Sequence, residues 1–117
     1  SSSHVISLLP EFATNYLFQE LMRYEDSDIQ PKLDSMVELP YNMVVIDRPN
    51  RFHDTVYKMA LAFGNDRHAA LIVDLTQQTE EIFRGTLPEI CERLKDIDPV
   101  NNFIDLAIVI AAKPGSN

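Results

Sequence analysis

Between residues 43 and 94, the spacing of the hydrophobic positions changes in a way that predicts five consecutive elements. The run 43–47, four apolar residues followed by Asp47, resembles a short strand, and residues 55–63 repeat apolar side chains at helical spacing. The segment 69–74 is apolar without alternation as far as Val73, which is typical of a strand that is covered on both faces. A short strand over 81–84 and a helix that begins at Thr86 complete the order strand–helix–strand–strand–helix.

An N-terminal helix is predicted over residues 10–24. Pro10 and Glu11 suit a first helical turn, because proline fits there and an acid complements the helix dipole. Phe18 and Met22 lie off the predicted apolar stripe, so they are either ordinary exposed residues or the contact surface for a partner. The stripe itself recurs at helical spacing and contains Phe12, Ala13, Tyr16, Leu17, Leu21 and Tyr24.

Residues 25–42 are predicted to be a linker between this helix and the five-element unit. The segment 25–32 is polar and contains Pro31, which argues against a regular helix. A short strand is possible over 36–39.

Two further connections complete the pattern. Residues 76–79 are polar and suit a hairpin connection. After the break at Asp98 and Pro99, the C-terminal segment 98–112 contains a strongly apolar strand over 106–111. No helix follows this strand in the sequence, so earlier elements or another chain must cover its faces.

Composition indicates one folded domain over residues 1–117. Of the 117 residues, 45% are hydrophobic and 24% are charged, which suits a single globular domain with a modest core. The predicted fold class is therefore α/β, of the α+β kind. It consists of a single β-α-β-β-α unit over 43–97, with an N-terminal helix and an extra C-terminal strand.

The charge and the cysteine content narrow the class of partner and the location. The formal net charge is −8 at pH 7 and the pI is about 4.7. A field of that sign repels nucleic-acid phosphates and anionic lipids, so neither nucleic acid nor a membrane surface is expected as a partner. Cys91 is the only cysteine, so no intrachain disulfide is possible, and no apolar run approaches the ~20 residues that span a bilayer. The expected location is intracellular, in the cytoplasm or the nucleus.

The sequence contains no familiar motif for catalysis or metal binding. His4, His53 and His68, with one cysteine, offer no metal-ligand spacing. The three glycines form no phosphate-binding loop, and no serine lies in a sharp glycine-flanked turn. Cys91 lies on the apolar stripe of the last predicted helix, where a small thiol is inert. We therefore expect no catalytic residue, no metal and no enzymatic activity.

Three segments of the central unit, MVVID, TVYKMALAFGNDRHAALIVD and IFRGTLPEICERL, resemble a CBS domain. They are most similar to the type found in the regulatory γ subunit of AMP-activated protein kinase. In such domains a strand leads into a helix, then into a two-strand hairpin and a closing helix. The resemblance implies a regulatory unit that packs against a second one and often binds an adenine nucleotide between them.

The same resemblance implies a set of ligand-binding residues. Glu89 aligns with the ribose-binding aspartate of the family, three residues after Thr86, although glutamate is one methylene longer. Arg67 and His68 lie where relatives place a basic residue near phosphate. Pro88 departs from the pattern, because many relatives keep a hydroxyl there. The ligand would be AMP, ADP or ATP, and no other cofactor is expected.

Each of these residues also has an interpretation without a ligand. Thr86 and Glu89 have the S/T-x-x-E spacing of a capping box, in which each side chain binds a backbone N–H at the start of a helix. Arg67 and His68 follow a helix and begin a strand, where a charged side chain is usually just solvated. A glutamate committed to its own helix cap is not available to a ribose.

Three hypotheses about function follow. The preferred one is a non-catalytic regulatory or assembly domain that binds a protein partner or a second copy, because only one CBS-like unit is visible and Phe18 and Met22 are candidate contacts. The alternative is a regulatory domain that senses an adenine nucleotide. The outside alternative is a small α/β enzyme whose site forms at a dimer interface.

Overall fold

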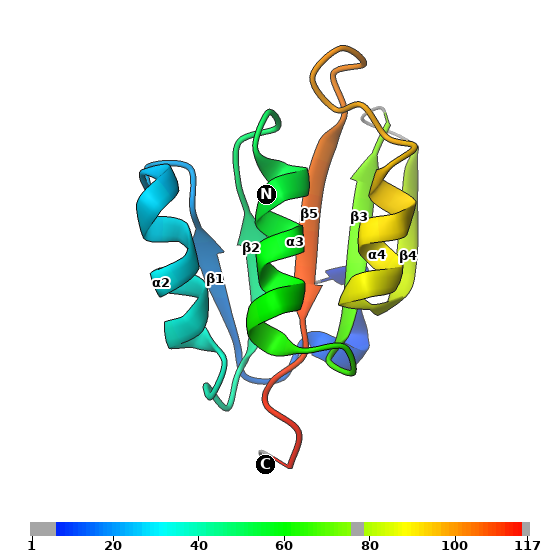
Figure 1. Cartoon of the computed structure of the whole chain (residues 1–117). Helices are drawn as coiled ribbons and strands as arrows, with labels where there is room; N and C mark the ends of the chain where they lie inside the picture. The colour runs from blue at the N-terminus through cyan, green and yellow to red at the C-terminus, as the bar shows by residue number, and fades with distance from the viewer. Residues whose placement is uncertain (1–6, 76–78, 116–117) are drawn as a thin grey trace.

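A five-stranded mixed sheet forms the centre of this computed structural model, which describes residues 7–75 and 79–115. The strand order is β1-β2-β5-β3-β4 (Figure 1). In chain order the elements of the described residues are η1 (Pro10–Phe12), β1 (Tyr16–Glu20), α2 (Asp26–Met36), β2 (Asn42–Ile46), α3 (Phe52–Phe63), β3 (His68–Asp74), β4 (Glu80–Thr86), α4 (Leu87–Leu94) and β5 (Asp105–Ile110).

The directions of the strands bring several chain reversals to one edge of the sheet. β1 and β2 are parallel, β5 is antiparallel to both β2 and β3, and β4 is antiparallel to β3. It follows that β1, β2 and β3 all end at the same edge, where β4 and β5 begin. We call this the carboxyl edge of the sheet.

The three α-helices cover one face of the sheet (Figure 1). Their buried side chains pack against inward-facing strand residues in one continuous core. The helical contribution comes from i, i+3 and i+4 positions, as expected for amphipathic helices. The fully buried members include Ile29 and Leu33 of α2, Val56 and Met59 of α3, and Leu87 and Ile90 of α4.

The opposite face of the sheet has a smaller, separate core. Val44, Ala70, Ile72 and Val109 are buried there beneath the N-terminal segment around η1, which contributes Leu9 and Phe12. Phe18 of β1 lies on the same face, because it is in register with Val44, but its side chain is 42% exposed. The segment around η1 therefore covers only part of this face.

The element order predicted for residues 43–94 is confirmed. It corresponds to β2, α3, β3, β4 and α4. Gly64 ends α3 with a φ of 90°, a backbone conformation that favours glycine. The predicted hairpin connection over 76–79 falls mainly on residues 76–78, which lie outside the described residues.

The predicted N-terminal helix over 10–24 is wrong. The segment instead forms the short turn η1 and the edge strand β1. In β1 the side chains of Leu17 and Phe18 face opposite sides of the sheet, so the same apolar residues that fit a helical stripe also fit a strand. Parallel pairing with β2 decides between the two, and the left-handed residue Asn15 (φ 51°) precedes the strand.

The predicted linker over 25–42 is also wrong, because most of it is helix α2. Ile29, Leu33 and Met36 occur at i, i+4 and i+7 and are all buried, so a narrow apolar stripe fixes an otherwise polar helix on the sheet. Pro31 lies inside this helix, one turn and a half from its start. The possible strand over 36–39 does not form, since α2 runs to Met36.

The C-terminal strand is not an addition to a complete unit. β5 lies in the middle of the sheet, paired with β2 on one side and β3 on the other, and residues 107–110 are buried. Earlier elements of the same chain therefore cover both of its faces. The structure is a mixed α/β fold, and a self-contained β-α-β-β-α unit over 43–97 does not exist in it.

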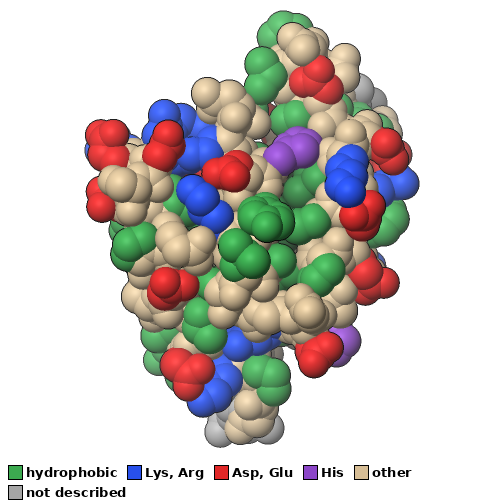
Figure 2. All heavy atoms as spheres, in the orientation of Figure 1, with side chains coloured by type: hydrophobic (Ala, Val, Ile, Leu, Met, Phe, Trp, Pro, Cys, Tyr) green, Lys and Arg blue, Asp and Glu red, His purple; other side chains and the backbone are tan. Residues whose placement is uncertain are grey.

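The surface of the helical face is mixed (Figure 2). Hydrophobic side chains gather over α3 near its centre, where Tyr57 and Leu61 are 58% and 64% exposed, and charged groups surround them. No helix among residues 7–75 and 79–115 has the length and apolar character needed to cross a membrane.

Replacing Leu33 with alanine should test whether α2 is a core helix. Leu33 is fully buried between α2 and the sheet, so the truncation should lower the free energy of unfolding by about 2–5 kcal/mol, measured by urea denaturation. Leu61→Ala on the exposed side of α3 is the matched control and should have a much smaller effect. Equal losses for the two variants would contradict the packing described for α2.

Candidate functional site

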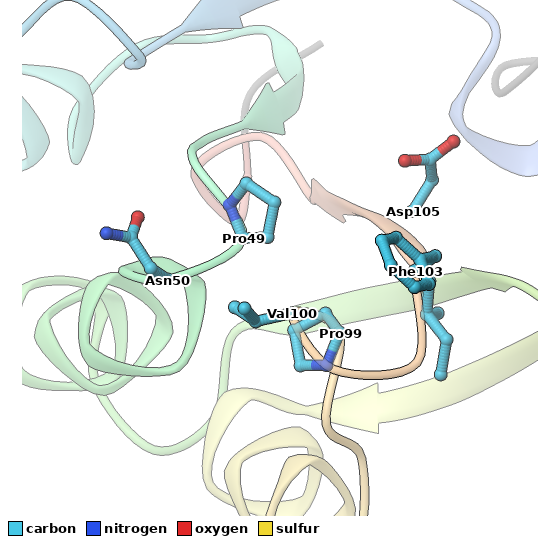
Figure 3. A pocket seen from close by; sticks show the side chains of 7 residues that line it. Pro49, Asn50, Pro99, Val100, Phe103 and Asp105 are labelled. Carbon is cyan, nitrogen blue, oxygen red and sulfur yellow. The ribbon is translucent and has the colours of Figure 1, made fainter.

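A shallow hollow of about 360 Å³ lies at the carboxyl edge, between the segment that follows β2 and the loop that leads into β5. Figure 3 shows the side chains that line it: two prolines and a phenylalanine surround the opening, and Asp105 lies at its far side. The lining residues are Pro49, Asn50, Pro99, Val100, Phe103, Ile104 and Asp105.

A second hollow of about 220 Å³ adjoins the first and shares Pro49, Ile104 and Asp105 with it. Met22, from the segment after β1, lies on its rim and is 37% exposed. The other lining residues are Ile46, Asp47, Phe52 and Leu106. Together the two hollows give the carboxyl edge an apolar surface with carboxylates at its margin, which is the usual composition of a small-molecule site.

The loop before β5 has an internal network of hydrogen bonds. The Asp98 carboxylate accepts from the Asn101 backbone N–H at 3.0 Å and from the Asn101 side-chain amide at 2.7 Å. These bonds lower the pKa of Asp98 below its usual range. The Ile104 N–H donates to the Pro99 carbonyl at 3.0 Å, which closes the loop.

His53 anchors the other end of this loop to the start of α3. Its Nε2 lies 2.7 Å from the Leu94 carbonyl oxygen and 2.8 Å from that of Ile97. Because both partners are acceptors, Nε2 carries the proton and donates to both. The histidine therefore binds carbonyls at the end of α4 rather than acting with its neighbour Asp54.

Phe103 stands out within the loop. Its side chain is 89% exposed, and its backbone has a φ of 53°, in the left-handed region. Such a conformation destabilises a non-glycine residue by about 1–3 kcal/mol, and a phenyl ring that stays exposed offsets little of this through burial.

Behind the hollows, a buried ion pair holds the segments of the carboxyl edge together. Asp47 and Arg51 are only 7% and 8% exposed and form two hydrogen bonds, at 2.7 and 2.9 Å. Arg51 also donates to the carbonyls of Leu21 and Tyr24 and to the Asp26 carboxylate, at 2.8–2.9 Å. Five bonds account for the five N–H donors of a guanidinium, so this arginine is fully committed to the fold.

Two opposing effects, burial and hydrogen bonding, act on the charged form of Asp47. Burial raises the pKa of the Asp47 carboxyl, but hydrogen bonds from Arg51, from the Thr55 hydroxyl at 2.6 Å and from the Arg48 N–H outweigh it, and the pKa lies below its usual range. The hydrogen bond to Asp47, opposed by burial, raises the pKa of Arg51. The pair therefore stays ionised across the physiological range.

Two more carboxylates lie side by side at the carboxyl edge. Asp74, at the end of β3, is in register with Asp105, at the start of β5, and on its other side with Glu80 of β4. The Oδ1 atom of Asp74 is buried and has no hydrogen-bond partner. An unpaired buried carboxylate oxygen beside a second carboxylate is unfavourable for the fold alone, and it favours a ligand that brings a positive charge or a donor.

Thr86 and Glu89, from the predicted nucleotide set, form the capping box of α4. The Glu89 carboxylate accepts from the Thr86 N–H at 2.9 Å, and the Glu89 N–H donates to the Thr86 hydroxyl. The pKa of Glu89 is lowered, chiefly by the bond to the Thr86 backbone. A Cβ at Gly85 would lie 3.0 Å from Glu89 Oε1, which explains the glycine before the cap. The interpretation without a ligand therefore describes what these side chains contact.

Arg67 and His68 separate in the structure. His68 begins β3 in register with Thr86 and is exposed, whereas Arg67 is 6% exposed and points to the other side. The Arg67 guanidinium donates to the Val37 and Ala111 carbonyls at 3.0 and 3.2 Å, and burial lowers its pKa. The four predicted ligand residues thus do not converge on one pocket, since Arg67 ties the C-terminal segment to the end of α2.

Phe18 and Met22 are exposed, as expected for residues off the core, at 42% and 37%. Whether a partner contacts them stays a prediction. Asp74, Asp105 and Phe103 were not singled out from the sequence, and neither were Asp47 and Arg51. A signal was present, because an aspartate that directly follows a buried strand and an arginine four residues later can form a pair across the first turn of the next helix.

No protein-family model and no curated protein sequence matches the chain. Solved structures with a similar fold do match, and several of them are methyltransferases. The methyltransferase CobJ has a TM-score of 0.57 at 11% identity, over 86% of this chain and 42% of its own.

Two further methyltransferases give similar values. Uroporphyrin III C-methyltransferase from Thermus thermophilus has a TM-score of 0.53 at 15% identity, over 86% of this chain and 41% of its own, and was also solved with S-adenyl homocysteine (S-adenosylhomocysteine). The cobalamin biosynthetic enzyme CbiF, a cobalt precorrin-4 methyltransferase, has a TM-score of 0.51 at 9% identity, over 88% of this chain and 42% of its own. The chain thus spans less than half of the length of each enzyme it matches, and at these identities the likeness establishes the fold.

The resemblance to a CBS domain is wrong. The physical reason is the position of β5, which separates β2 from the β3–β4 hairpin, so residues 43–94 form part of a larger sheet rather than a unit of their own. The fold is instead similar to part of the CobJ, uroporphyrin III C-methyltransferase and CbiF structures.

The functions inferred from that resemblance are corrected with it. A non-catalytic regulatory or assembly domain and an adenine-nucleotide sensor are contradicted, and so is the expectation that the chain has no enzymatic role, because the matched structures are enzymes. Among them, the bound molecule is S-adenosylhomocysteine, not AMP, ADP or ATP, which overturns the cofactor expectation.

Replacing Arg51 with methionine should destabilise the protein strongly. The variant keeps much of the side-chain volume but leaves Asp47 buried and unpaired, so the free energy of unfolding should fall by about 3–5 kcal/mol in urea denaturation. The control is Lys95→Met, which removes an exposed pair with Glu92 and should change little. A small loss for Arg51→Met, close to that of the control, would show that the buried pair does not hold the edge together.

Stability should fall in acid as Asp47 takes up a proton. Its folded pKa lies below the unfolded value of about 3.9, so the folded state binds fewer protons and the stabilisation is complete only above about pH 4. It is lost as the pH falls through the folded pKa. Asp47→Asn cannot titrate, so its free energy of unfolding should depend less steeply on pH between about pH 5 and 2. Parallel pH profiles for the two proteins would assign the acid sensitivity to other carboxyls.

Proposed function

We propose that this chain is a domain of an S-adenosylmethionine-dependent methyltransferase and that its carboxyl edge forms one wall of the reaction site. The observation that carries the proposal is the fold: most of the chain superimposes on less than half of each matched methyltransferase. A domain of this size would contribute one part of the reaction site of a larger enzyme.

The surface of the carboxyl edge suits methyl transfer. S-adenosylmethionine supplies a methyl group on a positively charged sulfur, ready for direct displacement by a nucleophile. That chemistry asks a protein mainly to align two reactants and to exclude water. Met22, Pro49 and Ile104 supply apolar walls that can pack against the reactants, and the carboxylates at the margin offer a negative field to a cation.

The residues present fit the donor in two respects. The buried and unpartnered Oδ1 of Asp74, in register with Asp105, can accept from a hydroxyl or an ammonium group or lie near a sulfonium. The second hollow, with Ile46 and Leu106 in its lining, can hold an apolar ring. Asp74 and Asp105 are thus the residues that would hold the polar part of the donor.

The proposal predicts that S-adenosylhomocysteine binds the 117-residue chain and raises its melting temperature by mass action. Asp105→Asn should weaken this binding about tenfold in isothermal titration calorimetry, because one charge-assisted hydrogen bond or ion contact is lost. The matched control is Asp66→Asn, an exposed aspartate in the loop between α3 and β3, and should bind as the unmodified chain does. Absence of any binding at millimolar S-adenosylhomocysteine would refute the proposal.

A further inference from the structure

The loop before β5 presents an aromatic ring that the fold does not use. Phe103 is the most exposed of the large hydrophobic residues described, at 89%, and its left-handed backbone would suit glycine better. Folding alone would favour replacing it. A phenylalanine at this position therefore points to a contact made outside the folded domain.

The loop that carries the ring has an ordered backbone. The Asp98 carboxylate binds Asn101, the Ile104 N–H closes the loop on Pro99, and His53 fixes the carbonyls at the beginning of the segment. A loop whose backbone is already ordered loses little further conformational entropy when a second ring stacks on its aromatic side chain. Preorganisation of this kind is a property of binding sites.

The surroundings of Phe103 indicate the shape of its ligand. Pro49, Val100 and Ile104 line the same hollow, which is shallow and open to solvent (Figure 3). An open apolar surface with a projecting phenyl ring contacts the flat face of a conjugated ring better than it encloses a branched aliphatic group.

The charges around the hollow indicate the sign of the ligand. Its lining contains one charged residue, the carboxylate Asp105, and no lysine, arginine or histidine. Arg48, Arg51 and Lys58 line a different hollow between α2 and α3, and each has a partner there. Arg48 donates to the Tyr24 carbonyl, Arg51 binds Asp47 and Asp26, and Lys58 binds Asp54. The lining of the hollow around Phe103 therefore offers no cation to an anionic ring, and Asp105 would repel such a ring.

We propose that Phe103 is a stacking platform for a flat conjugated ring that is neutral or positively charged, and that this ring belongs to the methyl acceptor. The inference rests on the proposed function for the role of the ring as acceptor. It adds to that function a class of methyl acceptor, because it excludes an acceptor rich in carboxylates. Phe103 and Val100 then set the specificity, and Asp105 selects against negative charge.

The test is a titration of the ¹⁵N-labelled 117-residue chain, followed by amide chemical shifts, with three flat dyes: methylene blue (cationic), riboflavin (neutral) and resorufin (anionic). The expected result is that methylene blue and riboflavin shift the amides of Val100, Phe103 and Ile104, while resorufin binds at least about tenfold more weakly. Shifts confined to other parts of the chain, or tightest binding of the anionic dye, would overturn the proposal.

Two substitutions at position 103 separate binding from folding. Phe103→Gly removes the ring and relieves the left-handed backbone, so the variant should melt at the same or a higher temperature and bind riboflavin about tenfold more weakly. Phe103→Trp keeps a flat ring and should retain binding. It also introduces the only tryptophan of these 117 residues, whose emission should change on addition of the ligand.

Leu61→Ser is the matched control, because it removes an exposed hydrophobic side chain from α3, away from the hollow, and should leave dye binding unchanged. Equal dye affinities for Phe103→Gly and the unmodified chain would overturn the role of Phe103. Binding of S-adenosylhomocysteine, measured on the same samples, keeps the two proposals apart. A chain that binds S-adenosylhomocysteine but not the dyes refutes only the stacking platform. The reverse result refutes the methyltransferase, and with it the role of the ring as methyl acceptor, and leaves only the stacking by Phe103.

Discussion

The buried guanidinium of Arg51 is the interaction on which the carboxyl edge depends. It lies where four segments meet: the chain after β1, the start of α2, the end of β2 and the first turn of α3. Its donors satisfy the carbonyls of Leu21 and Tyr24, which would otherwise be polar groups next to an apolar core. Asp47 compensates its charge and is in turn bound by Thr55. Because a buried charge without its partner is costly, the four segments form this arrangement together or not at all.

The position of β5 is the second constraint, and it creates the site as well as the fold. A strand from the C-terminal end of the chain inserts between β2 and β3, so the loop that leads into it emerges beside the segment after β2. Pro49 and Phe103 come close only through this insertion. The same pairing sets Asp105 opposite Asp74. Hence the two hollows and the paired carboxylates are consequences of strand order.

Sequence reasoning succeeded where structure is local. The five elements over 43–94 and the capping box of Thr86 and Glu89 depend on neighbouring residues, and each formed as predicted. It failed for β1 and α2. The residues of β1 fit both a helical stripe and a strand, and Pro31 hid a helix whose stability comes from three buried side chains rather than from propensity.

The strand order could not be obtained from the sequence, because pairing between distant strands leaves no local pattern. The candidate site shares this limit. Asp47, Arg51 and Asp105 are unremarkable singly in the sequence, and they matter only through contacts across the sheet. Phe103 is different, since it follows two asparagines in a polar loop, and its exposure was foreseeable from that context.

The failure of the CBS interpretation shows that the order of strands in the sheet, rather than the order of elements along the chain, determines where the candidate site lies. The order strand–helix–strand–strand–helix describes residues 43–94 correctly and still misidentifies the protein, because that order is compatible with more than one sheet. In a unit closed on itself, the polar groups at the start of α4 would be the natural place for a ligand. In the sheet observed, β5 separates β2 from β3, and the polar groups at the start of α4 only cap that helix. The groups without a partner in the fold lie at the carboxyl edge instead. There the fold leaves a carboxylate oxygen without a partner and a phenyl ring in solvent. Both are unfavourable for the domain alone, and a ligand that donates a hydrogen bond and covers the ring would relieve both.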